Sequence, residues 1–376
     1  MKLDDAETPR LLLDTERLQQ NIDMMAARCA DLGVTLRPHL KTPKSLKVAE
    51  QAVPDKASPL TVSTLKEAEA FAAGGHTNIL CAAATAPTKL AHADRIQCTT
   101  NAWVILVTDS VALVEAADAK AGELGASFDF LIEVDCGEHR SGVKPASEEL
   151  LQVAEALKAA SHLRLVGVMS HAGHSYALDD PEQIADLAEV ERAAAADSAS
   201  MLREAGYDCE IVSIGSTPTV LHARHLEGVT EARAGVYLFW DLAQYSRKMC
   251  RLDDIAVTVL ATVIGHNREG KSIIIDAGAL ALSKDISANT FAPHVQYGFV
   301  CDVDTLEQFD GLSVSEVHQE HGTVFVPDES WFDRLPIGSQ VRVLPNHTCM
   351  TCAAYDAYDV VQGGEIVETW PRVNGW

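Results

Sequence analysis

The stretch RPHLKTPKS, residues 37–45, places an arginine, a histidine and two lysines directly after an apolar, strand-like run. The chain as a whole is acidic, with a formal net charge of −24, so this concentration of cations needs a local reason. A lysine at a strand end becomes a nucleophile when partial burial lowers the pKa of its amine, and it then forms Schiff bases with carbonyl compounds. Lys41 and Lys44 are the two candidates, and the alternative is that both are ordinary surface cations.

A second stretch, IGSTPT at residues 214–219, combines a glycine with hydroxyl side chains after another apolar run. Backbone N–H groups and hydroxyls in such a turn are suited to a phosphate group, although the same residues also form ordinary helix caps. Pyridoxal 5'-phosphate needs both an amine and a phosphate site. A strand-end lysine together with Ser216 and Thr217 therefore predicts this cofactor.

A third stretch, LPNHTCMTC at residues 344–352, contains His347 and Cys349 two positions apart. On a β-strand these side chains would point to the same face and could converge on one divalent ion. A nitrogen and sulfur pair favours zinc over magnesium. Two protein ligands leave positions for water or substrate, which is typical of a catalytic metal. Cys352 would face the other way on such a strand, and we interpret it as structural.

The elements that must position these groups alternate regularly over the first two-thirds of the chain. Eight short apolar runs are predicted strands, and they lie at residues 34–40, 60–64, 79–83, 103–109, 128–135, 165–173, 209–217 and 232–239. Ala/Leu/Glu-rich helical patterns separate them, with Thr15 and Ser147 as predicted N-caps. Eight such alternations predict a (β/α)8 barrel. A doubly wound sheet is the alternative, but no G-x-G-x-x-G motif follows the first strand.

In a barrel of this kind, functional groups gather at the carboxyl ends of the strands. Polar residues are concentrated at five of the predicted ends. They are Arg37, His39 and Lys41; Glu133, Asp135, His139 and Arg140; His171, His174 and Tyr176; Gly215, Ser216 and Thr217; and Arg233, Gly235 and Tyr237. We expect these groups to line one rim.

The pattern changes after about residue 250, where alternating or apolar runs with Gly-rich turns replace helices. This predicts a mostly antiparallel β-domain, which the run LLLD at residues 11–14 would join. We therefore expect a barrel at residues 15–248, with residues 1–14 and 249–376 forming a β-domain that carries the metal site.

The composition limits the partners and the compartment. A sequence pI of about 4.9 gives no net positive field for nucleic acid or anionic membrane. The nine cysteines are scattered and odd in number, which favours reduced thiols. The N-terminus has no apolar signal core and no run is long enough to span a membrane, so we expect a cytoplasmic protein.

Several motifs together resemble one known family. They are RPHLKTPKS, GEHRSGV, SHAGHSY, SIGSTPT, TEARAGVYLFWDL, QEHG at 319–322, LPNHTC and the terminal RVNGW. In this order and spacing they are similar to the zinc-dependent D-serine dehydratase group, which includes D-threo-3-hydroxyaspartate dehydratase. D-threonine and 3-hydroxyaspartate aldolases are close relatives. The resemblance covers nearly the whole chain and implies a fold-type III pyridoxal phosphate enzyme built like alanine racemase.

The resemblance also implies a role for each candidate residue. Lys41 would hold the cofactor covalently, His171 would lie near the pyridine ring, and Arg140 would hydrogen-bond the phenolic oxygen. The phosphate would be held by Ser216, Thr217, Gly235 and Tyr237. Arg233 stands where alanine racemases place the residue that faces the ring nitrogen. Tyr176 would line the substrate pocket, and His347 and Cys349 would bind zinc.

The sequence departs from the family pattern at two positions. Several relatives have KTHK where this chain has KTPK, with Pro43. His174 stands where dehydratases carry small polar residues. We expect it to act as an acid or base of the site, which would differ from the arrangement in those dehydratases.

The resemblance implies elimination of water from a β-hydroxy-D-amino acid, D-threo-3-hydroxyaspartate or D-serine, to give a 2-oxo acid and ammonia. The alternative is retro-aldol cleavage to glycine and an aldehyde, with His174 as base. Aldolases of this type have Asp as the second ligand and use Mn²⁺, Mg²⁺ or Co²⁺, so Cys349 favours zinc and the dehydratase. A racemase is a weaker alternative, because it has no use for the metal pair. A non-catalytic cofactor carrier of the same fold lacks the β-domain. A zinc-only hydrolase is a third alternative, and such a protein would be colourless. Family analogy further implies a homodimer.

Overall fold

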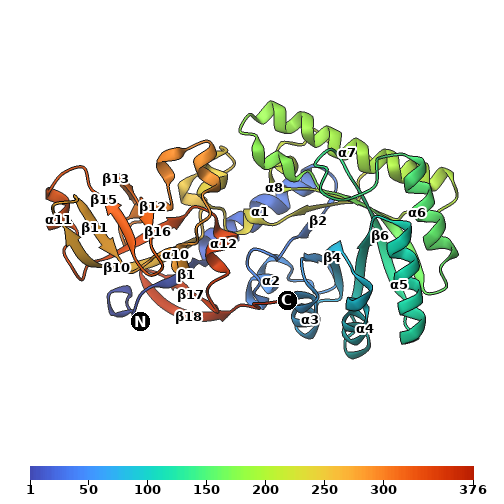
Figure 1. Cartoon of the computed structure of the whole chain (residues 1–376), viewed down its shortest axis with the longest axis horizontal. Helices are drawn as coiled ribbons and strands as arrows, with labels where there is room; N and C mark the ends of the chain where they lie inside the picture. The colour runs from blue at the N-terminus through green and yellow to red at the C-terminus, as the bar shows by residue number, and fades with distance from the viewer. The chain divides into compact units, whose positions relative to one another are not determined.

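The computed structural model describes residues 1–376, which divide into two compact units (Figure 1). The sheet unit comprises residues 1–22 and 236–374, and the barrel unit comprises residues 23–235 and 375–376. The domain limits given above, 15–248 for the barrel and 1–14 with 249–376 for the β-domain, stay a prediction. Helix α1, Thr15–Asp31, contains the first point at which the chain passes from one unit to the other.

The barrel unit contains a sheet of eight parallel strands in the order β2-β9-β8-β7-β6-β5-β4-β3. The strands are β2 Thr35–Pro38, β3 Pro59–Val62, β4 Asn78–Ala84, β5 Trp103–Thr108, β6 Phe128–Val134, β7 Leu163–Ser170, β8 Ile211–Ile214 and β9 Glu231–Ala234. Each lies within or overlaps one of the eight predicted runs, so the predicted barrel strands are confirmed.

The two ends of this sheet meet and close the barrel. A parallel bridge joins His39, directly after β2, to Thr61 of β3, and the N–H of Leu40 donates to the Thr61 carbonyl at 2.9 Å. One buried apolar cluster of these strands comprises Leu80, Ile105, Val107, Leu131, Val166 and Met169. Such strands are apolar along their length because helices cover their outer faces.

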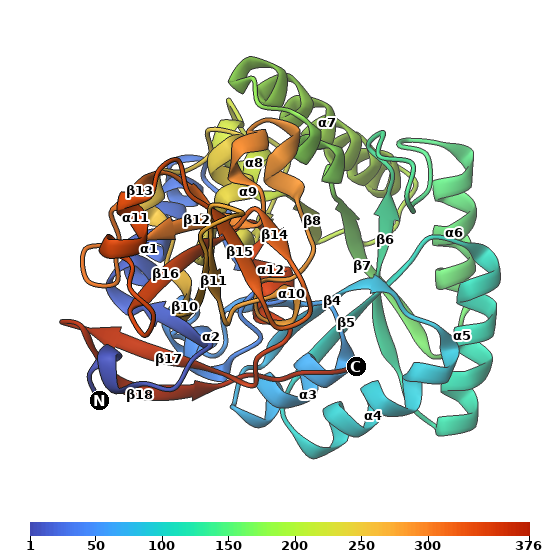
Figure 2. The same cartoon turned by 60° about the vertical axis from the view of Figure 1, so that its left-hand side comes forward.

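The covering helices follow their strands in sequence (Figure 2). They are α2 Leu46–Ala52, α3 Leu65–Ala73, α4 Leu90–Thr99, α5 Val111–Leu124, α6 Glu148–Ala159, α7 Pro181–Glu204 and α8 Thr217–His222, with 3₁₀ turns η2 Pro87–Lys89 and η3 Gly173–Ala177. The predicted cap Ser147 is confirmed, since its hydroxyl accepts from Leu150 N at 3.3 Å. The predicted cap Thr15 is wrong, because Asp14 Oδ1 accepts from the N–H groups of Glu16 and Arg17, both at 3.0 Å.

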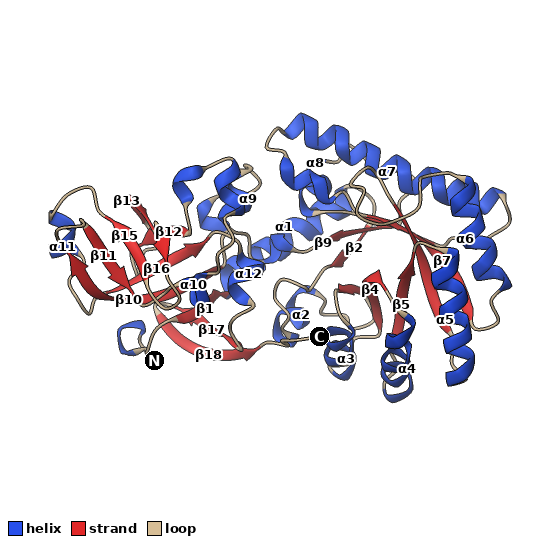
Figure 3. Cartoon of the chain, in the orientation of Figure 1, coloured by secondary structure: helices blue, strands red, loops and turns tan.

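The sheet unit is built on a mostly antiparallel sheet in the order β13-β12-β16-β10-β1-β17-β18, with β11, β14 and β15 attached through β10 (Figure 3). The strands are β1 Arg10–Asp14, β10 Val257–Asn267, β11 Ser272–Ile275, β12 Gly298–Cys301, β13 Gln308–Ser313, β14 Glu316–Val317, β15 Gly322–Phe325, β16 Gln340–Pro345, β17 Ala357–Gln362 and β18 Glu365–Pro371. Strand β1 pairs with β10 and β17, which confirms that LLLD joins this sheet.

Short helices connect the strands of the sheet unit. They are η1 Leu3–Asp5, η4 Val236–Leu238, α9 Leu242–Ser246, η5 Leu252–Asp254, α10 Ala279–Leu282, η6 Ser287–Thr290, η7 Pro293–Val295, α11 Ser330–Arg334 and α12 Thr348–Cys352. One of them, α12, carries Cys349, a candidate metal ligand. No helix in the chain combines the length and the apolar character that crossing a bilayer requires.

Candidate active site

The two candidate lysines at the end of β2 have different surroundings. Lys44 Nζ lies 3.1 Å from Oε1 of the buried Glu67. The Glu67 carboxylate also accepts from the Thr64 hydroxyl at 3.0 Å and from Ser63 N at 3.2 Å. The Lys44 amine is therefore engaged in an ion pair with a buried carboxylate. Lys41 is exposed and has neither a hydrogen bond nor an ion pair within the chain, so its amine is the available one.

His171 follows β7 and is held as a neutral ring. Its Nδ1 lies 2.8 Å from the Gly215 carbonyl oxygen, and because a carbonyl only accepts, Nδ1 must carry the proton. Burial lowers the pKa of His171 to about 3; the Gly215 hydrogen bond opposes this shift, and the charges of Lys41, Arg233 and Arg140 add to it. The Nε2 lone pair therefore remains free to accept a hydrogen bond at neutral pH.

Two further histidines at the strand ends have buried ring atoms without protein partners. Nδ1 of His39 and Nδ1 of His174 are both buried and unbonded. Burial lowers the pKa of His39 well below its usual value, and the nearby charges of Lys41, Arg233 and His171 add to this effect. Buried polar atoms are normally satisfied, so these two nitrogens indicate places where a bound molecule completes the hydrogen bonding.

The turn between β8 and α8 is tightly constructed. Gly215 has a φ of +130°, and a Cβ there would lie 2.3 Å from the Arg233 carbonyl oxygen. Its N–H donates to Glu191 Oε1 at 3.0 Å, and Ser216 N donates to the Thr219 hydroxyl at 3.1 Å. The backbone N–H groups of Gly215 and Ser216, which the sequence pattern suggested for a phosphate, are therefore both bonded within the protein. Glu191 binds the first, and Thr219 binds the second as part of a capping box.

The remaining phosphate candidates of the barrel unit lie together beside this turn. The Thr217 side chain is fully buried, and its hydroxyl accepts from Gly235 N at 3.3 Å. A Cβ on Gly235 would lie 2.8 Å from the His39 carbonyl oxygen, so only glycine allows this approach. Tyr237 belongs to the sheet unit, where it is buried in η4.

Arg233 is a buried cation of the barrel unit. Its guanidinium donates to the Ser213 hydroxyl at 2.6 Å and to the Ser170 carbonyl at 2.5 Å. Ser213 in turn donates to Glu231 at 2.6 Å, and Glu231 forms a 2.7 Å ion pair with Arg37. Burial lowers the pKa of Arg233, whereas the charges of surrounding carboxylates raise it. Arg37 is thereby a structural cation of the barrel interior.

The other predicted rim residues lie in loops. Arg140 is 55% exposed and lies 3.5 Å from Glu138 and 3.9 Å from the buried Glu133, so it is free to move toward a ligand. Tyr176 lies in η3, two residues after His174. These residues fit the pyridoxal phosphate prediction: a free amine, a neutral imidazole and unpartnered ring nitrogens surround a glycine-lined turn with buried hydroxyls.

The predicted metal ligands lie after β16, but not on a strand. Strand β16 ends at Pro345; His347 has extended backbone at the start of α12, and Cys349 lies within that helix. The strand interpretation is wrong because Thr348 begins a helix: its N–H donates to Asp241 Oδ2 at 3.0 Å and its hydroxyl to the Trp240 carbonyl at 2.7 Å. The side chains of His347 and Cys349 are nevertheless hydrogen-bonded to each other.

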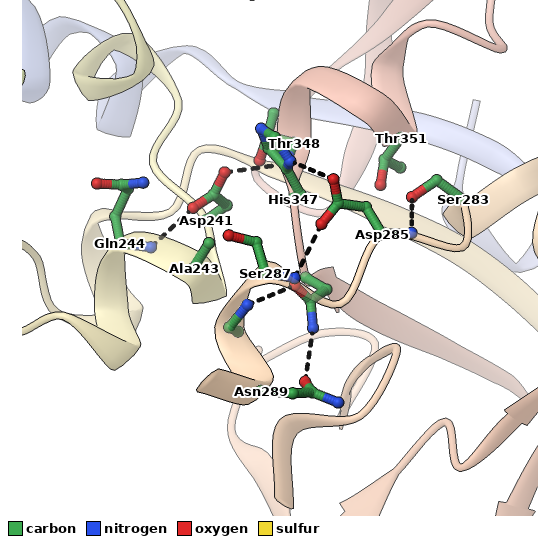
Figure 4. A network of polar contacts seen from close by, with 12 residues as sticks. Asp241, Ala243, Gln244, Ser283, Asp285, Ser287, Asn289, His347, Thr348 and Thr351 are labelled. Atoms are coloured by element: carbon green, nitrogen blue, oxygen red, sulfur yellow. Dashed lines mark hydrogen bonds and ion pairs between the residues drawn. The ribbon is translucent and has the colours of Figure 1, made fainter. Parts of the chain in front are cut away.

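A carboxylate fixes the orientation of the His347 ring (Figure 4). His347 Nδ1 lies 2.9 Å from Asp285 Oδ2, and Asp285 is itself held by Ser287 N at 2.8 Å. Burial lowers the pKa of His347, but hydrogen bonds to Asp285 and Cys349 and the charges of Cys349 and Asp241 outweigh it and raise the pKa to about 11. Nδ1 is bonded to Asp285, so an ion would bind Nε2 in place of the proton that this nitrogen carries, as in carboxylate–histidine–metal arrangements.

The donor set fits a metal with open coordination positions. His347 and Cys349 are two ligands, and they would leave the remaining coordination positions to water or substrate.

Several residues that support these sites gave no signal in the sequence. Glu67, Glu191 and Asp285 lie in none of the motifs, and Asp241 lies within TEARAGVYLFWDL, where no role is predicted for it. Each of them accepts hydrogen bonds that fix a predicted site residue or its loop. Only these contacts in the folded chain identify them.

Replacing Asp285 with alanine is expected to weaken zinc binding about 10–100-fold, because loss of the acceptor frees the His347 ring to rotate. Competition titration of the purified protein against a chromophoric chelator measures this directly. Asp310, an exposed carboxylate of the same unit, supplies the control D310A. Equal zinc affinities for D285A and wild type would show that the carboxylate does not orient the ligand.

Comparison with known proteins gives a consistent result over the whole chain. Residues 13–243 match the family described as "Alanine racemase, N-terminal domain" and residues 256–361 match "Putative serine dehydratase domain". The chain is 42% identical to D-threo-3-hydroxyaspartate dehydratase of Delftia sp. (strain HT23) over 98% of both chains. It is 29% identical to D-serine dehydratase of Dictyostelium discoideum, covering 100% of this chain and 98% of the relative. It is 28% identical to 3-hydroxy-D-aspartate aldolase of Paracoccus denitrificans over 98% of this chain and 92% of the relative.

Solved structures agree with these relatives. The Delftia dehydratase superposes with a TM-score of 0.95 over 100% of both chains. Its structures include a histidine-to-alanine variant and a cysteine-to-alanine variant, the latter in a metal-free form. The two altered positions of that protein are two residues apart, the same spacing as His347 and Cys349. The chain therefore belongs to the family of D-threo-3-hydroxyaspartate and D-serine dehydratases, lyases with an alanine racemase-type barrel.

Proposed function

We propose that this lyase removes water from a β-hydroxy-D-amino acid, D-threo-3-hydroxyaspartate or D-serine, and releases a 2-oxo acid and ammonia, with pyridoxal 5'-phosphate and zinc as cofactors. The observation that carries the proposal is the hydrogen-bonded pair of His347 and Cys349, in a chain 42% identical to a dehydratase of this kind over nearly its full length. A thiolate and an imidazole are ligands that select zinc.

The cofactor would be held by residues of the barrel rim. Lys41 supplies the amine, since Lys44 is occupied by Glu67, and Thr217 and Gly235 support the phosphate. His171 presents a neutral ring whose protonated Nδ1 is fixed by a carbonyl. Pyridoxal phosphate, when bound, acts as an electron sink that makes the α-proton of an amino acid acidic.

The chain's own groups then divide the work of elimination. Lys41 Nζ, once free, is the base that takes the α-proton of the substrate. His347 and Cys349 hold the metal, and zinc, when bound, is the Lewis acid that helps the β-hydroxyl depart. The C–O bond breaks as the α-proton is lost, so one water leaves; hydrolysis of the resulting enamine gives the 2-oxo acid and ammonia.

A second candidate, retro-aldol cleavage to glycine and an aldehyde, is favoured by His174, whose Nδ1 is buried without a protein partner. That reaction needs a base for the β-hydroxyl proton rather than for the α-proton. The relatives include aldolases as well as dehydratases, so the products must decide.

The deciding measurement is product analysis with three substrates. We expect D-threo-3-hydroxyaspartate and D-serine to yield oxaloacetate and pyruvate with one equivalent of ammonia, and D-threonine to yield little glycine. Chromatography of the amino acids together with a coupled 2-oxo acid assay separates the outcomes. Stoichiometric glycine without ammonia would establish the aldolase instead.

A further inference from the structure

Glu191 is a buried carboxylate that the proposed chemistry does not use. It lies in the middle of α7, and its side chain is fully buried, with 0% exposure. It has no ion-pair partner within the chain. Acidic side chains are rarely buried without a cation, so a carboxylate in this place must be satisfied by other donors and needs a specific reason.

Three hydrogen bonds from two separate segments satisfy this carboxylate. Oε1 accepts from Ala172 N at 2.8 Å and from Gly215 N at 3.0 Å. Oε2 accepts from the Thr219 hydroxyl at 2.7 Å. Ala172 follows β7, whereas Gly215 and Thr219 belong to the turn that connects β8 to α8. Glu191 therefore ties together the ends of two neighbouring strands of the barrel.

The same contacts lead directly to the predicted cofactor-binding groups. His171, next to Ala172, donates from Nδ1 to the carbonyl oxygen of Gly215. Glu191 binds the N–H of the same glycine, so both backbone polar groups of Gly215 are fixed. Thr219 accepts from Ser216 N at 3.1 Å while donating to Glu191. Loss of the carboxylate would leave both Gly215 N and the Thr219 hydroxyl without their acceptor. The turn would then no longer be held in this conformation.

The hydrogen bonds also agree with an ionised carboxylate. All three partners donate, and a charged carboxylate only accepts. Burial raises the pKa of Glu191, whereas the hydrogen bonds from Thr219, Ala172 and Gly215 and the charge of Arg233 lower it.

We infer that Glu191 is a positioning residue: it fixes the turn at residues 215–219 in the arrangement that receives the phosphate of the cofactor. The inference rests on the proposed use of pyridoxal phosphate. Glu191 itself does not contact the cofactor; it preorganises the groups that do.

The test compares two ligands that differ only in the phosphate. Apo forms of wild type, E191A and E191Q are titrated with pyridoxal phosphate and with pyridoxal, and binding is followed by absorbance. E191A is expected to bind pyridoxal phosphate about 10–100-fold more weakly but pyridoxal less than about threefold more weakly. E191Q should restore affinity to within about fivefold of wild type, because the amide oxygen still accepts both N–H groups and Thr219 can turn its hydroxyl to the Ser216 carbonyl, 3.3 Å away.

The control on the same helix is E189Q, which weakens the ion pairs of Glu189 with Arg192 and His225 and should leave both affinities unchanged. If E191A does not fold, T219V replaces it, since it deletes the hydroxyl between Glu191 and Ser216 and should show the same selective loss. Equal weakening of both ligands, or no weakening, would overturn the inference. Failure of wild type to bind pyridoxal phosphate would instead overturn the proposed function.

Discussion

A Lys41→Ala enzyme is expected to lose the visible absorption band of a lysine-bound pyridoxal cofactor, at roughly 400–430 nm, and to lose turnover by about 10³-fold. The reason is that Lys41 is the rim amine without a hydrogen bond or ion pair, whereas Lys44 is paired with Glu67 at 3.1 Å. The spectrum of the purified variant and its turnover with D-threo-3-hydroxyaspartate measure the two effects separately.

The matched control is Lys44→Arg, which removes the other amine and keeps a cation beside Glu67. A guanidinium stays protonated and cannot replace an amine nucleophile, so this variant should keep the absorption band and most of the turnover. A normal band in Lys41→Ala together with a missing band in Lys44→Arg would exchange the roles of the two lysines. Lys44→Ala is a poorer control, since it leaves the Glu67 carboxylate buried without its cation.

The barrel could be predicted from the sequence because its signals are local and repeated. Each strand is a short apolar run followed by polar residues, and a parallel strand covered on its outer face has no polar alternation to obscure that pattern. The polar residues after these runs, including Lys41, His171 and Thr217, were therefore predicted as rim residues from their order alone.

The local geometry of the metal pair could not be predicted in this way. Alternate positions on a strand share a face, and an extended residue just before a helix can also reach the second residue of that helix, so LPNHTC fits either. The choice depends on Asp241, more than one hundred positions earlier in the sequence, whose buried carboxylate accepts from Thr348 N and caps the helix. Glu191 and Asp285 escaped prediction for the same reason: their partners are set by tertiary packing, and no spacing in the sequence marks them.

These supporting carboxylates have a common physical role. Asp241, Asp285 and Glu191 each accept from groups on a segment other than their own, and each holds a residue or turn placed in the candidate site. Buried acceptors of this kind restrict the orientations of backbone and imidazole groups before any ligand arrives, which lowers the entropic cost of binding. Sequence motifs therefore identify the groups that touch a ligand, while the structure identifies the groups that hold them still.

The second large effect is expected at Cys349. Cys349→Ala should lose bound zinc and reduce elimination of water from D-threo-3-hydroxyaspartate by about 10²–10³-fold, because Lewis-acid assistance to a leaving hydroxide amounts to several kcal/mol. Cys349→Asp should recover part of the metal binding but shift its preference from zinc toward Mn²⁺ or Mg²⁺, since a carboxylate is a harder ligand than a thiolate. Metal analysis and turnover in the presence of each ion measure both changes.

Cys352→Ala is the matched control, because that thiol lies in the same helix, is fully buried and is assigned no metal. It should retain zinc and turnover, and chelator treatment should inactivate it as it inactivates wild type. The ligand substitutions also separate the two proposed reactions: an aldolase that works with harder ions would remain active in Cys349→Asp supplied with Mn²⁺ and would release glycine. Undiminished ammonia release by zinc-free Cys349→Ala would show that the hydroxyl departs without the metal, and the pair of His347 and Cys349 would lose its part in the reaction.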